Sequence, residues 1–512
     1  MNQLQEQVSL HRAAQCLLNN NVGDARLICE GILAKNKKNV HALSLLGQAE
    51  MQSGEIDSGL ALFRKAAALQ PKSLDIQLNL AQALARAGQY REAIKTFQKA
   101  LRTSPGNAEA IQGMATAYER SGDDAAAEQL LKPIIDAGRE DPALAVIQAT
   151  LDLKLKRPER AVAVLARHVE SANAPPRFFF TLGKAYEQLK DFDRAFDAYV
   201  KGNQAEPRRF DLEAQRQYTL SMLRTFSAAN LRKMPRARHG SRLPVIVTGR
   251  PRSGTTLVGR IIAAHPQAHE GGELNYLSNL TVRLSLEIGS TSVFPESALD
   301  MDQNDVDRLG AEYIEHLKRL GPRAARLVDK NMGNVTQMGF VNLLVPNAAA
   351  ILCDRDPIDC GFSIFAERFS AQNTYSADLH SIGVTHHLTE LLRQHWLRVL
   401  DMPTMQVRYE DTIADQDAVS RRVIEFCGLP WNDQCLKYYE SKDQARGVAP
   451  AQTLSYDQVR KPIYTTSVGR ARNFAHRLAP LCEGLEHGRR LAIEIAAELH
   501  VDYDPGPMPD LA

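Results

Sequence analysis

The stretch LPVIVTGRPRSGTTLVGRIIAAH (243–265) decides the fold of the C-terminal half of this 512-residue chain. Its apolar, β-branched start predicts a buried strand, and the apolar run after Thr256 predicts a helix. Between them, Gly249 and Gly254 bracket a loop of arginine, proline and serine. A strand, a glycine-bearing loop and a helix aim backbone N–H groups and the positive end of a helix dipole at one point, where a phosphate binds. The stretch therefore predicts an α/β domain with a parallel sheet that binds an anionic ligand.

The loop departs at one position from the P-loop that binds nucleoside triphosphates. Gly249 and Gly254 keep the spacing of that motif, but Thr255 stands where the motif requires a lysine. Without this lysine the β- and γ-phosphates of ATP lose their cation, which disfavours an ATP-dependent kinase. The same absence weakens an interpretation of Asp329, at the end of an apolar run, as a metal-binding aspartate.

The run PRSGTTL (251–257) resembles the 5′-phosphosulfate-binding loop of sulfotransferases that use 3′-phosphoadenosine-5′-phosphosulfate (PAPS). It is most similar to the tyrosylprotein-sulfotransferase-like branch, and the resemblance extends over about residues 243–480. It implies a three-layer, P-loop-like α/β domain with Arg252 beside the sulfuryl group. The loop residues that it assigns to the nucleotide are Arg250, Arg252, Ser253, Gly254, Thr255 and Thr256.

A second matching segment, HEGGELNYL (269–277), implies the catalytic base. In the related enzymes a Gly-Glu-Glu segment at this distance after a His-Pro pair supplies the base. Counting through His265-Pro266 places the base at Glu273, while Gly272 replaces the first of the two glutamates. The structural alternative is that Glu273 only caps a helix.

The remaining catalytic candidates also rest on the resemblance. Lys330, at the end of the predicted strand RLVDKN (326–331), is placed against the sulfuryl or bridging oxygen, and Ser455 assists the reaction centre. The implied mechanism is an in-line displacement in which Glu273 takes the proton of the acceptor and Arg252 and Lys330 stabilise negative charge.

Arg355 and Ser363 are the candidates for the 3′-phosphate, the group that separates this donor from ATP-like nucleotides. Arg355 follows a predicted strand at 349–353, and Ser363 lies eight residues later on a predicted helix. Arginine gives bidentate contacts to phosphate, and serine adds a hydroxyl donor. Taken alone, Arg355-Asp-Pro could equally be a helix-entry loop. The resemblance assigns four more residues to the nucleotide: Tyr409, Ser467, Gly469 and Arg470.

No metal is expected, since arginine and lysine take the place of magnesium and His386-His387 has no ligand spacing. The expected co-substrate is therefore PAPS alone. The acceptor stays open between a protein or peptide tyrosine, a glycan, a lipid and a metabolite. A repeat scaffold with a degenerate nucleotide-binding domain is the main functional alternative.

The first 206 residues repeat with a period of 34 residues. Gly54, Gly88 and Gly122 share this spacing, and a small residue follows each of them five positions later. Three further pairs of residues keep the same 34-residue step, and so do two prolines that follow helical runs. These are Asn20 with Ala25, Lys156 with Ala161, Lys190 with Ala195, and Pro71 with Pro105.

This pattern resembles the tetratricopeptide repeat (TPR), in which two antiparallel helices approach closely at a small residue. The predicted fold is thus α plus α/β: an α-solenoid of about six hairpins over 1–206, a basic helical linker over 207–242, and a sulfotransferase domain over 243–505. An irregular helical bundle is the alternative for the first region. The groove of a solenoid suits a peptide or a protein partner. The alternative is that the array only dimerises the protein or spaces the catalytic domain.

The composition predicts no binding to nucleic acid and no membrane-spanning segment. The formal net charge is only +2, so there is no bulk attraction to polyanions. The N-terminus lacks the pattern of a secretory signal, and no apolar run is long enough to span a bilayer. Seven cysteines without CxxC spacing suit reduced thiols, so a cytoplasmic location is expected. The oligomeric state, a homo-oligomer included, is left open.

Overall fold

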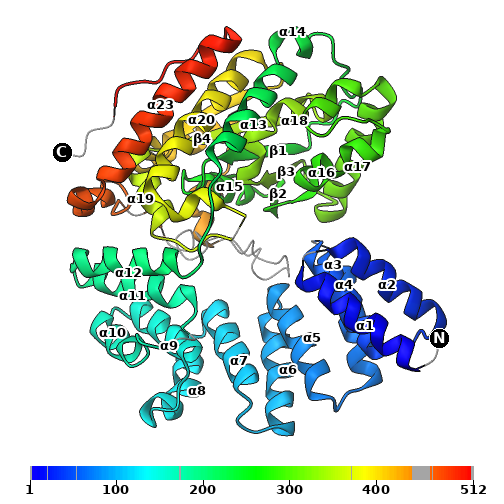
Figure 1. Cartoon of the computed structure of the whole chain (residues 1–512), viewed down its shortest axis with the longest axis vertical. Helices are drawn as coiled ribbons and strands as arrows, with labels where there is room; N and C mark the ends of the chain where they lie inside the picture. Colours follow the sequence, from blue (N-terminus) through cyan, green and yellow to red (C-terminus); the bar gives the residue numbers. More distant parts are fainter. Residues whose placement is uncertain are drawn as a thin grey trace. The chain divides into compact units, whose positions relative to one another are not determined.

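The computed structural model describes residues 3–19, 21–53, 55–171, 174–370, 372–440, 462–463 and 465–508. These residues form two compact units, of which the first runs to Leu189 and the second begins at Lys190. The first consists of helices, and the second holds a sheet with helices on its faces (Figure 1).

Paired helices build the first unit, which confirms the predicted array of helical hairpins. The helices are α1 (Gln3–Leu18), α2 (Val22–Lys35), α3 (Val40–Gln52), α4 (Ile56–Leu69), α5 (Leu74–Arg86), α6 (Tyr90–Thr103), α7 (Ala108–Ser121), α8 (Asp124–Asp136), α9 (Pro142–Lys154), α10 (Pro158–Ala166) and α11 (Pro176–Gln188). Several begin at an Asn or Asp whose side chain accepts a hydrogen bond from the first helical turn, as at Asn39, Asn107 and Asp141.

The repeat period reflects two steric requirements. The small residues of the register, such as Ala93 and Ala161, are fully buried where the two helices of a hairpin meet. The turn positions adopt the left-handed conformation that ends a helix, with φ of 73° at Gly88 and 82° at Gly122. Lys156, in the same register, has φ of 56°. Asn20 and Gly54, also in this register, lie outside the described residues.

A parallel sheet with the order β2-β3-β1-β4-β5 forms the centre of the second unit. Its strands are β1 (Pro244–Gly249), β2 (Ala268–Gly272), β3 (Arg326–Lys330), β4 (Ala349–Asp354) and β5 (Thr404–Arg408). Side chains of β1 alternate between two apolar cores, Ile246 in one and Val245 and Val247 in the other. The sheet is therefore covered on both faces, and the predicted α/β domain with a parallel sheet is confirmed.

Two groups of helices supply these cores. The larger core is built mainly from α13 (Leu212–Thr225), α16 (Tyr276–Ile288), α17 (Gln303–Leu320), α18 (Met338–Leu344), α20 (Leu379–Val399) and α23 (Ala479–Leu499). The smaller is built mainly from α15 (Thr255–Ala263), α22 (Gln416–Phe426) and η4 (Asp433–Glu440). The remaining elements are α12 (Phe192–Gln204), α14 (Ala228–Leu231), α19 (Pro357–Phe365), α21 (Tyr409–Ala414), η1 (Glu296–Asp300), η2 (Met332–Thr336), η3 (Thr374–Ala377) and η7 (Arg470–Arg477).

The segment predicted as a basic linker, 207–242, is an integral part of the second unit. Leu220, Met222 and Leu223 of α13 are buried in the larger core, as is Phe226 just after the helix. Basic residues of this segment are also engaged: the Arg208 side chain is 2% exposed and pairs with Glu206, and Arg224 pairs with Glu498. The expectation of a solvated linker is thus corrected. Its helical pattern was visible in the sequence, but the surface that the helix covers was not.

Helix α12 belongs to the sixth repeat by sequence register and to the second unit by packing. Phe196 lies against Phe365 and Phe474, with ring centroids 5.5 and 6.4 Å away. The Asn203 amide donates to the Phe365 carbonyl over 2.9 Å. The second compact unit thus begins inside the sixth repeat, before the predicted domain boundary at 206. In the described part of the chain, no helix is long and apolar enough to cross a membrane.

Candidate active site

Most of the candidate residues converge on one edge of the sheet. Because all five strands are parallel, their carboxyl ends meet there: β1 leads into the loop 250–254, β4 into Arg355, β5 into Tyr409 and β2 into Glu273, while Lys330 ends β3. In open parallel sheets this is the edge at which ligands bind.

The loop after β1 has an unusual backbone that only some residues tolerate. Arg252 adopts φ of 69°, and Gly254, which caps the N-terminus of α15, adopts φ of 91°. A Cβ atom on Gly249 would lie 2.4 Å from the Cys353 carbonyl oxygen, so a side chain does not fit there. Such a turn followed by a helix N-terminus presents successive N–H groups to an anion. Ser253 and Thr255 are buried in it.

A β-bulge at the end of β2 orients Glu273. Glu270 pairs with Val328 and Gly272 with Asp329, so Gly271 is an extra residue in the register, and Gly272 has φ of 79°. On a regular strand Glu270 and Glu273 would face opposite sides. The extra residue instead brings Glu273 to the side of Lys330, whose ammonium donates a hydrogen bond to the Glu273 carboxylate.

Lys330 lies in a buried cluster of charges. Its side chain is 3% exposed, and it passes over α15, where a Cβ atom on Gly259 would lie 3.7 Å from the Lys330 Cβ. Next to Gly259 on the helix, Arg260 forms a 2.9 Å ion pair with Glu270. Burial lowers the pKa of Lys330, the carboxylates of Glu273 and Glu270 oppose this, and Arg260 adds to the lowering.

A second cluster joins the loop after β1 to α19. The Arg252 Nε atom donates to the Ser363 hydroxyl over 2.9 Å, and the Arg355 guanidinium donates to the Arg252 carbonyl over 3.2 Å. Arg355 also stacks on Tyr409, 4.7 Å from the ring centroid. The Arg355 Nε atom is buried and has no hydrogen-bond partner within the described residues.

Residues 467–470, here called the closing segment, form backbone hydrogen bonds to the same cluster. The Ser467 carbonyl accepts from Arg355 over 2.5 Å, and the Gly469 N–H donates to the Asp359 carboxylate over 2.6 Å. The Arg470 guanidinium lies 5.0 Å from the centre of the Phe362 ring. These contacts bring Ser467, Gly469 and Arg470 to the first two turns of α19.

Arg250 faces a different set of partners from the other loop residues. It is buried and forms an ion pair with Asp354, donates to the Arg355 carbonyl over 3.1 Å, and contacts His386 Nε2 at 3.1 Å. Burial, followed by the Arg250 charge, holds the pKa of His386 well below its usual value, so this imidazole is neutral. Arg250 therefore ties the ends of β1 and β4 to α20.

Sequence reasoning missed the residues that orient the candidates. Asp359 holds the closing segment, Asp354 and His386 hold Arg250, and Arg260 and Glu270 flank Lys330. A weak signal existed for Asp354, because it directly precedes Arg355. Ser455 lies outside the described residues. Among the described residues, no group of three or more His, Cys, Asp or Glu side chains could hold a metal ion.

Residues 244–433 of the second unit match the family model described as the sulfotransferase family. The chain therefore joins tetratricopeptide repeats to a sulfotransferase-family domain. The repeats match tetratricopeptide-repeat models at residues 44–108, 84–151 and 176–208.

Individual relatives of the chain are distant. An uncharacterized protein of Aquifex aeolicus is 29% identical over 357 residues, which are 67% of this chain and 46% of that protein. Protein-tyrosine sulfotransferase of Drosophila melanogaster is 25% identical over 235 residues, 43% of this chain and 45% of that protein. The chain thus covers about half the length of these relatives. A solved tetratricopeptide repeat protein from Parabacteroides merdae aligns with a TM-score of 0.36 and 16% identity, over 42% of this chain and 82% of that one.

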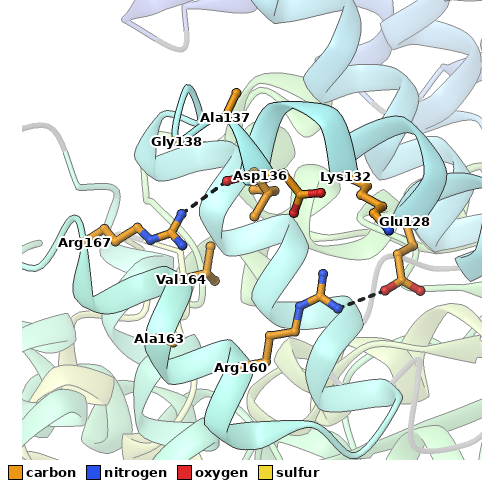
Figure 2. A pocket seen from close by; sticks show the side chains of 10 residues that line it. Glu128, Lys132, Asp136, Ala137, Gly138, Arg160, Ala163, Val164 and Arg167 are labelled. Carbon is orange, nitrogen blue, oxygen red and sulfur yellow. Dashed lines mark hydrogen bonds and ion pairs between the residues drawn. The ribbon is translucent and has the colours of Figure 1, made fainter.

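The repeats contain a pocket of about 810 Å³ between α8 and α10, the second helices of two neighbouring hairpins (Figure 2). Its arginines are engaged with neighbours: Arg160 pairs with Glu128, and Arg167 donates to the Ile135 carbonyl and pairs with Glu140. The pocket is therefore polar, with opposite charges already matched inside it.

Proposed function

We propose that the second unit is a PAPS-dependent sulfotransferase that moves a sulfuryl group to an acceptor hydroxyl. The observation that carries this proposal is the Glu273–Lys330 ion pair, a base and a cation at the ends of β2 and β3, on the edge that also holds the loop 250–254. The match to the sulfotransferase family supports it. The distant protein-tyrosine sulfotransferases support the same chemistry.

The residues of the edge suit a nucleotide with two separate anionic groups. The loop 250–256 offers backbone N–H groups for one of them. Arg355 and Ser363 offer a guanidinium and a hydroxyl for the other, and the buried Nε atom of Arg355 is a donor that a phosphate oxygen would satisfy. Tyr409 supports the Arg355 plane from one side.

When bound, PAPS supplies an activated sulfuryl group. Glu273 accepts the proton of the acceptor hydroxyl, and the neighbouring Lys330 ammonium donates a hydrogen bond to its carboxylate. Lys330 and Arg252 stabilise the negative charge that develops, with Ser455 assisting. Arg250 acts on this site indirectly, since its described partners hold the loop and Arg355 in place.

For the acceptor, we propose the tyrosine hydroxyl of a protein or peptide held by the repeats. The named sulfotransferase relatives act on protein tyrosine, and repeat arrays commonly bind peptides. A glycan, a lipid or a metabolite remains the alternative. We further propose a cytoplasmic location, in keeping with seven cysteines that are all free thiols.

Isothermal titration with 3′-phosphoadenosine-5′-phosphate (PAP), ATP and ADP, without metal, tests the donor site. We expect selective binding of PAP and its loss in Arg355→Ala. The matched control is Arg490→Ala, because Arg490 is exposed on α23 and pairs only weakly with Glu486. A preference for ATP with magnesium would contradict the proposal. Binding of PAP without transfer to any acceptor would favour the scaffold alternative.

A further inference from the structure

The end of β2 places two carboxylates, rather than one, around the buried lysine. We propose that Glu270, fixed by Arg260, is a positioning residue that supplies a second counter-ion for Lys330. It keeps Lys330 protonated while Glu273 carries the proton taken from the acceptor. The role of Lys330 in transfer rests on the proposed function, whereas the arrangement of charges does not.

The geometry of the bulge brings the four charges to one side of the sheet. Glu273 contacts Lys330 directly, and Glu270 lies three residues earlier on the other side of the extra residue. Arg260 reaches Glu270 from the helix turn that faces Lys330. The Arg260 and Glu270 side chains are only 9% and 14% exposed, so water screens this pair poorly.

Charge balance explains why a second carboxylate is needed. Before the reaction, two cations and two carboxylates make the cluster neutral. Protonation of Glu273 would leave a nearly buried ammonium without its direct partner, and a buried ammonium without a counter-ion tends to lose its proton. With Glu270 still charged, Lys330 keeps its proton, and the cluster gains one positive charge as negative charge develops on the reacting group.

Other described neighbours of Lys330 are apolar or lie on the opposite face of the sheet. From β1, the residue paired with Lys330 is Val247, and on α15 Gly259 faces the Lys330 Cβ. The Asp329 side chain lies on the opposite face of the sheet, where the Tyr313 hydroxyl donates a hydrogen bond to its carboxylate over 2.6 Å. Burial raises the pKa of Asp329 to about 7. The groups that act most strongly on the pKa of Lys330 are thus Glu273, Glu270 and Arg260, while Asp329 also interacts with the Lys330 charge from the opposite face.

The direct test is the titration of Lys330 itself, followed by NMR of the full chain labelled with ¹³C at lysine Cε. The Lys330 signal is assigned by its loss in Lys330→Arg. We expect a lower titration midpoint in Glu270→Gln than in the wild type, and the lowest midpoint in Glu270→Gln with Glu273→Gln. Glu315→Gln is the matched control, because Glu315 is exposed on α17 and pairs with a surface lysine. It should leave the midpoint unchanged.

Arg260→Gln gives a shift of the opposite sign, which a general loss of packing would not produce. Removing this cation should raise the Lys330 midpoint, since Arg260 lowers the pKa of Lys330. The Arg260→Gln variant also tests the inference if Glu270→Gln fails to fold because Arg260 loses its ion pair with Glu270. Equal midpoints in Glu270→Gln and the Glu315→Gln control would overturn the inference. So would an Arg260→Gln midpoint at or below that of the wild type.

Kinetics separate this inference from the proposed function. With PAPS and an acceptor, Glu270→Gln should move the alkaline limb of kcat to lower pH. On that limb it should reduce kcat about ten-fold, less than the roughly 10²–10³-fold cost of removing a donor that contacts the developing charge. PAP affinity near pH 6.5 should stay unchanged. The NMR titration needs neither donor nor acceptor. Shifts of the expected signs in a protein that binds no PAP would overturn the proposed function and retain Glu270 as the counter-ion of Lys330.

Discussion

The ion pairs of the repeats and those at the carboxyl edge of the sheet bury their cations to different depths. In the repeats, ion pairs link neighbouring hairpins at the surface, as between Arg64 and Glu92, whose side chains are 47% and 50% exposed. At the carboxyl edge of the sheet, the cations of three ion pairs are at most 9% exposed: Lys330 with Glu273, Arg260 with Glu270, and Arg250 with Asp354. Exposed pairs contribute little to stability, and buried pairs cost desolvation. Buried cations at a sheet edge that binds ligands point to a functional site, whereas the buried charged groups in the described part of the repeats are carboxylates such as Asp152, whose partner Arg160 is 41% exposed.

The backbone shows the same contrast. Left-handed residues in the repeats end helices, where glycine such as Gly122 is the usual choice. In the loop after β1 an arginine, Arg252, takes this conformation without any helix to end. A strained residue persists only where its surroundings hold it, here through Ser363 and Arg355. The repeats therefore follow local rules, and the site departs from them.

The largest expected effect comes from removing the base. Glu273→Gln should reduce turnover on the order of 10²–10⁴-fold, the contribution of a general base, while PAP affinity stays close to that of the wild type. In the repeats, Ala161→Leu should lower stability without lowering turnover. It overfills a fully buried site and should cost about 1–3 kcal/mol of unfolding free energy, with turnover per folded molecule unchanged. Single-turnover assays and urea unfolding measure the two quantities. Equal turnover in Glu273→Gln and the wild type would refute the assignment of the base.

An intermediate effect is expected from two glycines with nearly the same φ, 91° at Gly254 and 83° at Gly106. A Cβ on Gly254 would lie 2.8 Å from the Tyr409 ring, while a Cβ on Gly106 meets nothing within 4 Å. Gly254→Ala should weaken PAP binding on the order of ten-fold, from about 1–2 kcal/mol of backbone strain in the loop. Gly106→Ala should lower only the stability of the repeats, by a similar energy. If both variants bind PAP like the wild type, the loop is not the anion site.

The smallest effect on the nucleotide site, namely none, is expected from two glycines of the repeats. A Cβ on Gly113 would lie 2.3 Å from the Phe97 ring, so Gly113→Ala should cost about 1–3 kcal/mol of unfolding free energy. Gly31 lies in α2, where an added Cβ would meet nothing within 4 Å, and Gly31→Ala should stabilise the helix by about 0.5–1 kcal/mol. Urea midpoints measure both. A lowered midpoint in Gly31→Ala would contradict the simple view that only space and propensity matter here.

Local patterns predicted the repeats and the first strand, loop and helix of the second unit well. A 34-residue period reflects contacts between neighbours in sequence, and Gly249 and Gly254 mark a turn that needs no distant partner. Helix α13 was misjudged because its apolar residues are ordinary for an amphipathic helix. Whether such a face meets a core or solvent depends on elements hundreds of residues away, as the Arg224–Glu498 pair illustrates.

The sequence by itself determined the two kinds of architecture and the residue types for an anion site and a base, since periodicity and motif spacing are local properties. Only the tertiary structure decided how these side chains are oriented. It showed that the bulge at Gly271 turns Glu273 toward Lys330, that Arg250 faces Asp354 and His386, and that Glu270 and Arg260 complete the charge cluster. The reason is physical: the register between strands β2 and β3 sets which face a side chain takes, and that register depends on residues far apart in the chain.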